Sequence, residues 1–239
     1  MSVAVTRVIN ACVLLEIDGE FVLTDPCFRR PFGVRFREPF GLSVDELPDL
    51  TAIVVGHRVP DHWQPRSLRG YRGRQSTPVF VPAAHMVRAA RRSGFANAEV
   101  LQWGDRRRVG RLTVVCAPGE RVAGMRTNAY VVATSSTSVL IATEARTVVP
   151  DTPVDVAVLP IDGARLFGRP LVMDAATAVT TARRLDAALV PIHFSQLPLP
   201  PVLRCPTGPE QLPSDVRVLA PGVRAVVSPR AGAARAGLA

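Results

Sequence analysis

Short apolar runs broken by turn residues open the chain and predict β-strands. Residues 3–9 and 12–17 are largely apolar, and residues 21–23 continue the pattern after the turn Asp18-Gly19. An acidic residue followed by glycine between two such runs is typical of a β-hairpin. This pattern predicts that the chain begins with antiparallel strands of one sheet.

The next hundred residues predict loop, strand and one helix. Residues 28–50 contain three prolines and no clean period, which predicts a long surface loop of the kind that is usually functional or mobile. A helix is predicted over 83–93, because Gly94 suits the left-handed position just past a helix end. Strands are predicted at 52–55, 79–81, 99–101, 106–109 and 112–116.

The second half of the chain shows the same kind of pattern, with short apolar strands and one helix. Asp174 is a good N-cap for a helix that runs to about Leu185, and the apolar residues 188–192 predict a buried strand that leads into His193. Residues 229–239 are expected to form a disordered tail. Further strands are predicted at 128–133, 138–142 and 156–159, and a last hairpin at 216–219 and 224–227 follows a proline-rich loop at 198–213.

Length and composition narrow the class of protein. The 239 residues are 47% apolar and 5% aromatic, which can fill the core of one large domain or two small ones. The same numbers exclude a disordered chain, a collagen-like repeat and a disulfide-stapled miniprotein. Cys12, Cys27, Cys116 and Cys205 show no CxxC spacing, so reduced, buried thiols are predicted.

The formal charge of +9 is weak evidence for a nucleic-acid partner. All 29 basic residues are arginine, and the bias towards Arg, Ala, Val and Pro indicates a GC-rich genome. A nucleic-acid surface would show clustered basic residues interleaved with aromatics. The arginines at 88–92 and 106–108 therefore predict solvated surface rather than a phosphate-binding patch.

Neither a membrane span nor an export signal is predicted. The apolar runs fall short of the ~18 residues that a span needs, and Arg7 and Glu16 interrupt the region where a signal peptide would be apolar. We therefore expect a cytoplasmic protein with no membrane and no nucleic acid among its partners.

Four histidines limit the search for chemistry. His57, His62 and His193 fall at, or just after, the end of a predicted buried strand, where the ligand crevice of an open α/β sheet lies. His85 falls in the first turn of the predicted helix, which favours a surface or packing histidine.

Asp61 joins two of these histidines in one short segment. His57, Asp61 and His62 lie within six residues of one another. Imidazole and ionised carboxylate both donate lone pairs to zinc or iron, so the group suits a divalent metal. The same spacing fits a capped helix start in which Asp61 accepts bonds from backbone N–H groups. The spacing alone leaves both interpretations open.

Seven segments follow one another in a recognisable order. They are LLEIDGEFVLTDPCF, IVVGHRVPDHW, VFVPAAHMVRAARRSGFANAEVLQWGD, VVCAPGER, SVLIATEA, VDVAVLPIDG and ALVPIHFSQ. This series resembles the metallo-β-lactamase superfamily, closest to its branch of ascorbate-6-phosphate lactonase-like and phosphodiesterase-like hydrolases, and the resemblance covers residues 3–228. It implies a fold of the α/β (α+β) class, an αβ/βα four-layer sandwich with a metal site at one end between two facing sheets.

The resemblance also implies the domain organisation and a structural turn. One domain is expected over 1–228, made of two βα halves at about 1–125 and 126–228. Asp25-Pro26 resembles the family's structural Asp-Pro turn, so the Asp25 carboxylate is expected to satisfy backbone donors near the metal loop.

Only part of the family's metal motif is present in this chain. His57, Asp61, His62 and His193 match ligand positions of the family. The other positions differ: Val59 and Arg121 stand where two histidines would be, Thr143 stands where a bridging aspartate would be, and Asn10 stands where a histidine is frequent.

These losses fall mainly on one of the family's two metal sites. The first site keeps only His57, whereas the second keeps its three unshared ligands, Asp61, His62 and His193. A catalytic zinc ordinarily needs three protein ligands and a water, and Arg121 would bring a fixed positive charge to the first site. We therefore predict one divalent metal, with zinc first and iron or manganese as alternatives, or no metal at all.

Two carboxylates stand beside the lost positions. Glu120 precedes Arg121, and Glu144 follows Thr143. Either could replace the missing metal ligand, and either could be an ordinary surface or loop carboxylate.

Two functions fit such a reduced site. The first is a one-metal hydrolase of an ester, lactone or phosphoester, in which His57 orients or shuttles a proton and Arg121 holds an anionic group of a small-molecule substrate. The second is a metal-free relative that keeps the pocket for binding, or for acid–base catalysis by His57, Asp61 and His62. A nucleic-acid-processing relative is disfavoured, because such enzymes resemble an intact two-metal design. The oligomeric state is left open.

Overall fold

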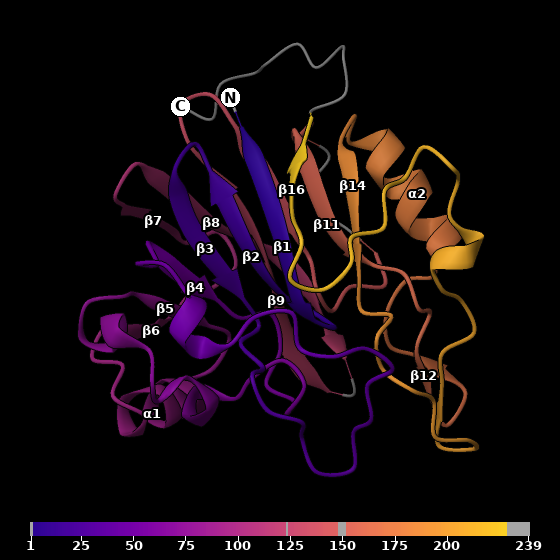
Figure 1. Ribbon diagram of the computed structural model, residues 1–239, viewed down its shortest axis with the longest axis horizontal. Helices are drawn as coiled ribbons and strands as arrows, with labels where there is room; N and C mark the ends of the chain where they lie inside the picture. Colours follow the sequence, from indigo (N-terminus) through magenta and orange to yellow (C-terminus); the bar gives the residue numbers. More distant parts are fainter. Residues whose placement is uncertain (1, 123, 148–151, 229–239) are drawn as a thin grey trace.

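The computed structural model describes residues 2–122, 124–147 and 152–228, so the predicted tail at 229–239 lies outside the described residues. Within these ranges, two mixed β-sheets face each other, and the helices α1 (Ala84–Arg92) and α2 (Ala175–Arg184) lie on opposite sides of the pair (Figure 1). This arrangement confirms the predicted four-layer sandwich of the α/β class.

The first sheet has the strand order β16-β1-β2-β3-β4-β5-β6. Its strands are β16 (Arg224–Val227), β1 (Val3–Ile9), β2 (Cys12–Ile17), β3 (Glu20–Thr24), β4 (Ala52–Val54), β5 (Val79–Val81) and β6 (Ala98–Val100). The strands β1, β2 and β3 pair antiparallel, as the apolar runs predicted, whereas β3, β4, β5 and β6 run parallel. The ends of β3 and β4 therefore lie at the same edge of the sheet.

The second sheet has the strand order β14-β11-β10-β9-β8-β7. Its strands are β14 (Ala188–Ile192), β11 (Val156–Pro160), β10 (Ser138–Ile141), β9 (Met125–Ala133), β8 (Leu112–Val122) and β7 (Arg106–Val109). Because β10, β11 and β14 are parallel neighbours, their carboxyl ends also lie together. The chain passes from the first sheet to the second between β6 and β7. The division of the domain into two halves near residue 125 stays a prediction.

Three apolar clusters fill the spaces between the layers. The central cluster combines strand residues of both sheets, such as Val13 and Leu15 from the first sheet with Val132 and Val158 from the second. A second cluster packs the first sheet against α1, and a third packs the other sheet against α2. The many fully buried valines explain why these segments read as nearly continuous apolar runs, since strands covered on both faces have no solvent side.

The helix ends follow the predicted signals. The Asp174 side chain accepts a hydrogen bond from the Thr177 backbone N–H at 2.8 Å, as expected of an N-cap before α2. Gly94 has φ +95°, the left-handed conformation predicted just past α1. None of the helices in the described ranges has the length and apolar character needed to cross a bilayer.

Three predictions of secondary structure are corrected. Residues 224–227 do not form a hairpin with 216–219; as β16 they pair antiparallel with β1, where Val3 lies opposite Val227. The loop after residue 198 contains β15 (Leu203–Arg204), which joins β12 (Arg165–Leu166) and β13 (Arg169–Pro170) in a small third sheet. The strand predicted at 112–116 continues to Val122. Distant partners explain the first two differences, since β16 pairs with β1 and β15 with β12, and local patterns do not report such pairings. The extended part of β8 pairs instead with the start of the next strand, where Val122 lies opposite Met125.

The surface and the cysteines largely match expectation. The arginines of α1 at positions 88, 91 and 92 are exposed, as are Arg106 and Arg108 on β7. Cys12, Cys27 and Cys116 are buried free thiols, while Cys205 is free but only half-buried. Burial raises the pKa of the Cys27 thiol to about 12, which keeps it protonated and unreactive.

Candidate metal centre

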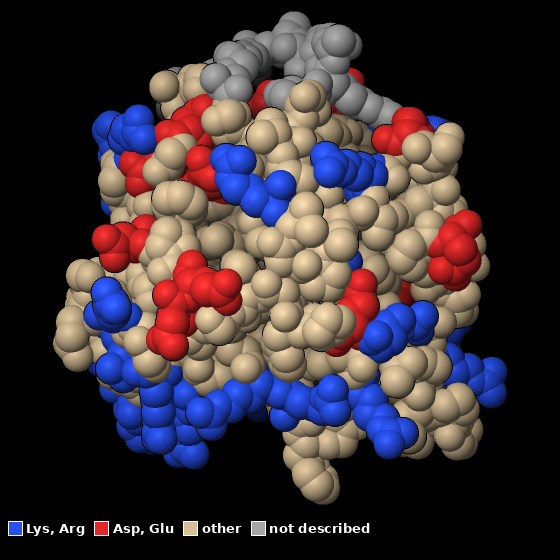
Figure 2. Space-filling view, in the orientation of Figure 1, with Lys and Arg blue, Asp and Glu red and all other residues tan. Residues whose placement is uncertain are grey.

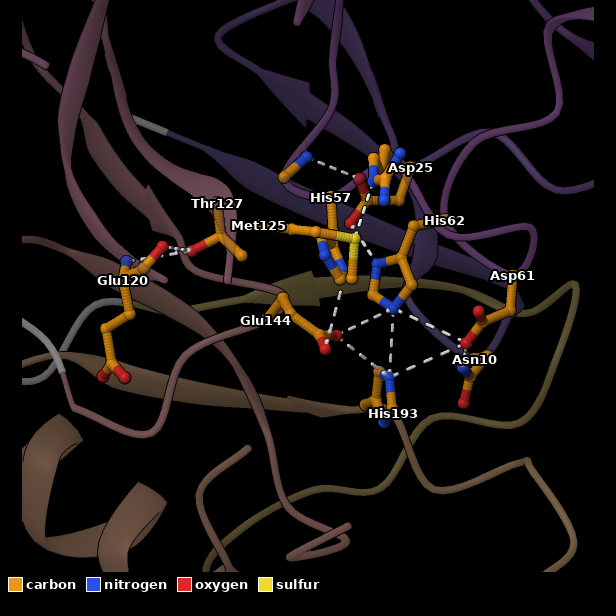
Figure 3. A network of polar contacts seen from close by, with 12 residues as sticks. Asn10, Asp25, His57, Asp61, His62, Glu120, Met125, Thr127, Glu144 and His193 are labelled. Atoms are coloured by element: carbon orange, nitrogen blue, oxygen red, sulfur yellow. Dashed lines mark hydrogen bonds and ion pairs between the residues drawn. The ribbon is translucent and has the colours of Figure 1, made fainter. Parts of the chain in front are cut away.

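The candidate site lies where strand ends from both sheets meet. From the first sheet, Asp25 follows β3 and His57 follows β4 by three residues. From the second sheet, His193 follows β14 directly, and the segments after β10 and β11 contribute Glu144 and Asp162. The expectation that the strand ends before His57 and His193 meet is confirmed, because His62, in the loop after His57, contacts His193 (Figure 3).

Asp61, His62 and His193 present their ligand atoms to one another. Nε2 of His62 lies 3.1 Å from Nε2 of His193. Oδ2 of Asp61 lies 3.6 Å from the His62 nitrogen and 4.0 Å from the His193 nitrogen. Ligand atoms around a tetrahedral zinc at ~2.0–2.1 Å are about 3.3 Å apart. The three predicted ligands therefore form a group of the size that one metal ion needs.

Glu144 adds a carboxylate to this group. Its Oε2 atom lies 3.0 Å from Nε2 of His62 and 3.6 Å from Nε2 of His193. The side chain is buried, and Oε2 has no hydrogen-bond partner in the described structure. Glu144, which follows the lost motif position at Thr143, therefore lies among the predicted ligands, and its interpretation as a surface residue is wrong.

Glu120, the other carboxylate considered, does not join the group. Its Oε2 accepts a hydrogen bond from Nε of Arg146 at 2.6 Å, and its Oε1 accepts from the Thr147 backbone N–H at 2.7 Å. Figure 3 shows the Glu120 side chain pointing away from Glu144 and the histidines. Glu120 therefore fixes the chain that follows Glu144 instead of supplying a ligand.

Two further carboxylates hold the rings of His62 and His193. Nδ1 of His62 donates to Oδ2 of Asp25 at 3.0 Å, and Nδ1 of His193 donates to Oδ2 of Asp162 at 3.1 Å. Both carboxylates are fully buried. A carboxylate on one ring nitrogen fixes the tautomer and leaves the other nitrogen as a lone-pair donor, as is usual for metal-ligating histidines.

This bonding makes the centre of the group suited to a cation. With Nδ1–H of each ring donated to a carboxylate, the two Nε2 lone pairs face each other at 3.1 Å, next to the unpartnered Oε2 of Glu144. Lone pairs at that distance repel one another unless a proton or a metal ion lies between them. Nitrogen and oxygen donors of this kind suit zinc, iron or manganese. The residues present therefore fit a divalent metal.

The pKa shifts of the buried groups at the site also indicate a preference for positive charge. Burial opposes the charged form of His193, but the carboxylates of Asp162 and Glu144 together outweigh burial and raise the pKa of His193 to about 9. Burial also opposes charge on His62, whose pKa is raised by Asp61, Asp25 and Glu144. In Glu144 burial would raise the pKa, yet the neighbouring histidines hold it well below its usual range. The site favours bound positive charge.

The segments that carry these residues are held by backbone contacts. Oδ1 of Asp25 accepts from the Gly56 backbone N–H at 2.6 Å, as expected for a structural Asp-Pro turn. Gly56 must lack a side chain, because a Cβ there would collide with Oγ1 of Thr143. The His193 backbone N–H donates to the carbonyl oxygen of Asn10 at 3.1 Å. The Asn10 amide in turn donates to Oδ2 of Asp61 at 3.3 Å.

A buried arginine supports the segment after His193. Arg7, from β1, stacks on the ring of Phe194 at 4.1 Å and donates to Oγ of Ser195 at 2.8 Å. Glu38, from the long loop, accepts from the same guanidinium at 2.5 Å. The Arg37 backbone N–H donates to the Ser195 carbonyl oxygen at 2.8 Å. The loop predicted at 28–50 is thus attached to the segment that positions His193.

His57 has a different environment from the other two histidines. Its Nδ1 lies 3.5 Å from Oε1 of Glu144, and both ring nitrogens are buried without a hydrogen bond in the described structure. Among the described residues, no carboxylate accepts a hydrogen bond from His57 and so fixes its tautomer. His57 therefore contacts the site through Glu144 and through its ring, which meets the His62 ring edge-on with centroids 6.0 Å apart.

The remaining predicted residues lie outside the group. Arg121 is exposed on β8, and in the described ranges it makes no hydrogen bond or ion pair with the site residues. His85 is exposed on α1, as expected. Asp162 was missed, although it follows the strand predicted at 156–159 and so stands near a strand end, like His57 and His193. It lies two residues beyond Pro160, which pairs with Ile192 in the neighbouring parallel strand, so its side chain falls beside His193.

The family of the chain is shown by its sequence. Residues 20–194 match the model of the β-lactamase superfamily domain, and this match covers well over half of the chain. The chain belongs to this family and has the metallo-β-lactamase fold, which confirms the resemblance at the level of the superfamily. The lactonase-like branch stays a prediction.

Curated relatives match over a smaller part of the chain. Uncharacterised proteins of Mycobacterium tuberculosis and Mycobacterium bovis are 31% identical over 126 residues, which is 48% of this chain. The match covers 33% of the length of each relative. The chain therefore spans only a part of the length of these proteins.

Solved structures align with nearly the whole chain at low identity. A possible metal-dependent hydrolase from Veillonella parvula has a TM-score of 0.76 at 17% identity, covering 95% of this chain and 100% of its own. The isothiocyanate hydrolase from Delia radicum gut bacteria has a TM-score of 0.74 at 17% identity, with 95% and 99% covered. Igni18, a metallo hydrolase from Ignicoccus hospitalis, has a TM-score of 0.72 at 18% identity, with 95% and 99% covered. These likenesses establish the fold.

Proposed function

We propose that the protein is a metal-dependent hydrolase that cleaves an ester, lactone or phosphoester of a small molecule. One divalent ion, zinc in the first place, is held by Asp61, His62 and His193, with Glu144 as a further carboxylate ligand. The observation that carries the proposal is the pair of facing Nε2 atoms of His62 and His193, 3.1 Å apart, each on a ring whose Nδ1 is bonded to a buried carboxylate. Family membership supports it, since proteins of the same fold are named as metal-dependent hydrolases.

A single ion fits the donors better than two. Val59 offers no donor atom, and Arg121 makes no contact with the group among the described residues. On that side, His57 and the Oε1 oxygen of Glu144 are left, which is fewer than the three protein ligands of an ordinary catalytic zinc.

The side chains around the ion have separate roles. Asp61, His62, His193 and Glu144 would hold a divalent ion, which would supply hydroxide near neutral pH and polarisation of a carbonyl or phosphoryl group. Hydrolysis consumes one water and releases an acid and an alcohol. His57, 3.5 Å from Oε1 of Glu144, can take up a proton at Nδ1 and return it to the leaving alcohol. Arg121 would hold an anionic group of the substrate, since a guanidinium pairs bidentately with carboxylate or phosphate.

Metal content tests the proposal directly. Protein purified without chelator, and protein reconstituted with zinc, iron or manganese, is examined by elemental analysis. We expect one ion per chain, which His193→Ala loses and His85→Ala retains, because His85 is exposed on α1. Removing one ligand should cost roughly 100-fold or more in affinity. Two ions per chain would contradict the single-ion site, and no ion after reconstitution would contradict the proposal.

Activity provides the second half of the test. The metal-loaded protein is assayed with chromogenic esters, lactones and phosphodiesters. We expect turnover of at least one class of substrate, and we expect His193→Ala to lack this turnover. In the native protein, chelation should abolish turnover and added metal should restore it. An ion bound without any such turnover would make the site structural.

A metal-free acid–base function is the second candidate. The raised pKa of His62 and of His193 favours this function, because after removal of metal by a chelator the two rings would hold protons in the place of a metal ion. Turnover that persists after complete chelation would support this candidate and contradict the metal-dependent one.

A further inference from the structure

A cavity of about 730 Å³ lies outside the group of histidines and carboxylates. Three arginines line it: Arg121 from the end of β8, Arg146 from the segment after β10, and Arg169 from β13. Apolar side chains of the β12–β13 turn, including Leu166 and Phe167, complete its wall. The Phe167 ring is 73% exposed, so a large apolar surface faces solvent beside the three guanidinium groups.

The walls of this cavity continue from the segments that carry the metal site. Arg146 follows Glu144 by two residues, and Leu166 follows Asp162 by four. Gly124 also lines the cavity and precedes Met125, whose sulfur accepts a hydrogen bond from Nε of Arg58, the residue after His57. The wall of the cavity is therefore continuous along the chain with segments that carry the site residues.

The charge of the cavity wall is strongly positive. Arg146 has a carboxylate partner, since Glu120 accepts from it at 2.6 Å. In the described part of the chain, the side chains of Arg121 and Arg169 have no hydrogen bond or ion pair. Two solvent-exposed guanidinium groups are thus available to a ligand. Guanidinium is the group best shaped for bidentate pairing with carboxylate or phosphate.

The surrounding surface reinforces this charge. Figure 2 shows arginine side chains gathered along the lower edge of the molecule, from the region of α1 to that of β12. A surface of one sign raises the local concentration of ligands of the opposite sign. Anions are therefore drawn towards the edge at which β12 lies.

We propose that this cavity binds a doubly negative group, a phosphomonoester or a dicarboxylate, on a partly apolar molecule. Two unmatched guanidinium groups match two negative charges, and the exposed Phe167 ring and Leu166 match an apolar body. The inference rests on the proposed function in one respect: when the metal centre is a hydrolase site, this molecule is its substrate, and the doubly negative group is the part that the cavity holds while another bond is cleaved.

Binding of small dianions tests the proposal without any need for turnover. Phenyl phosphate and phthalate are titrated into the native protein and into protein dialysed against a chelator, and affinities are measured by calorimetry or ligand-observed NMR. We expect at least one of the two to bind in both preparations, and the better of them identifies phosphate or dicarboxylate as the preferred group. Benzyl alcohol, which is uncharged, should bind at least tenfold more weakly.

Three variants sharpen the test. Arg121→Gln combined with Arg169→Gln should weaken binding of the preferred dianion about tenfold or more, since a charge-assisted hydrogen bond contributes strongly to affinity. Glu120→Gln should strengthen binding, because it removes the carboxylate that neutralises Arg146. Arg108→Gln is the matched control and should change affinity less than twofold, because Arg108 is exposed on β7 opposite Thr113, at the other end of β8 from Arg121.

The outcomes separate this proposal from the proposed function. Equal affinity of the double arginine variant and the native protein, or no binding of either dianion at millimolar concentration, would overturn the cavity proposal. Metal content would then be unaffected, and the hydrolase proposal would stand. Conversely, a protein that binds no metal but loses dianion binding in the double variant would retain the cavity as a binding site and lose the hydrolase.

Discussion

The two sides of the candidate metal centre hold their histidines in different ways. His62 and His193 each have one ring nitrogen bonded to a buried carboxylate, at 3.0 Å to Asp25 and 3.1 Å to Asp162. On the other side, both nitrogens of His57 are buried without a hydrogen bond among the described residues. One side is therefore arranged to hold a cation in a fixed geometry, and the other is not.

The difference indicates what would distinguish a metal-ligating histidine from another buried histidine near strand ends. All three histidines follow buried strands, and all three are buried. They are distinguished by their second partner, because a carboxylate behind the ring fixes its tautomer and makes the facing nitrogen a better donor.

Asp25→Ala should cause the largest loss of stability. The substitution leaves the Gly56 N–H and Nδ1 of His62 without their buried partner, and Asp25 has φ +39°, which alanine adopts less readily. Breaking a buried pair in this way costs about 3 kcal/mol. Denaturant unfolding measures the change, with the neutral Asp25→Asn as the milder control. Normal stability combined with lost activity would instead assign Asp25 a direct catalytic role.

Glu144→Gln should weaken metal binding about 100-fold, because it removes the charge and the ligand oxygen that face His62 and His193. Glu120→Gln is the matched control, since Glu120 bonds to Arg146 and Thr147 and should leave metal affinity unchanged. Competition with a chromogenic chelator measures both affinities. Equal losses in the two variants would show that overall charge, rather than coordination, produces the effect.

Asp162→Asn should weaken metal binding about tenfold, since loss of an outer-shell carboxylate typically costs 10–100-fold. The amide keeps the shape of the side chain and can still bond to Nδ1 of His193, but it no longer makes that ring more basic. The same titration measures the effect. Unchanged affinity would mean that the carboxylate behind His193 is not what distinguishes the two sides.

The stability of the chelated protein should fall as the pH rises from about 6.5 to 9. Burial opposes the charge on His193, but Asp162 and Glu144 together raise its pKa from 6.5 to about 9, so the folded state keeps a proton that the unfolded chain releases. This contribution is fully present below pH 6.5 and is lost as the pH passes 9. Unfolding curves at several pH values measure it, and His193→Gln should flatten the slope. With zinc present the trend should reverse, because metal ligands must be deprotonated.

His57→Gln should have the smallest effect on metal binding, less than about threefold, because His57 is not among the proposed ligands and only approaches Glu144 at 3.5 Å and the edge of the His62 ring. Turnover should fall much more than affinity, if His57 moves a proton as proposed. Elemental analysis and an activity assay on the same preparation measure the two effects. A loss of metal equal to that of His193→Ala would place His57 among the ligands and remove the contrast between the two sides.

Much of the fold could be predicted from the sequence because its signals are local. The strands β1, β2 and β3, the N-cap at Asp174 and the glycine after α1 each depend on residues close together in the chain. The partner of β16 could not be predicted in this way. It pairs with β1 from more than two hundred residues away, and an apolar run does not record which strand it will meet.

The candidate ligands also divide into those that the sequence identified and those that needed the structure. His57, Asp61, His62 and His193 were found because each follows a recognisable apolar run and matches a family motif. The choice between Glu144 and Glu120 needed the structure, since both carboxylates stand next to a lost motif position. Arg121 matches a ligand position in sequence, yet its side chain is exposed and lines the neighbouring cavity.

Most of the strands, the helix caps and the residues that follow the strand ends were therefore predictable from the sequence, because hydrophobic period and turn chemistry act over a few residues. Which side chains converge depends on the folded chain. Asp25, His62, Glu144, Asp162 and His193 come from segments up to 168 residues apart. Their approach depends on the packing of two sheets and on the direction in which each side chain leaves its strand end, and these are properties of the assembled core rather than of any one segment.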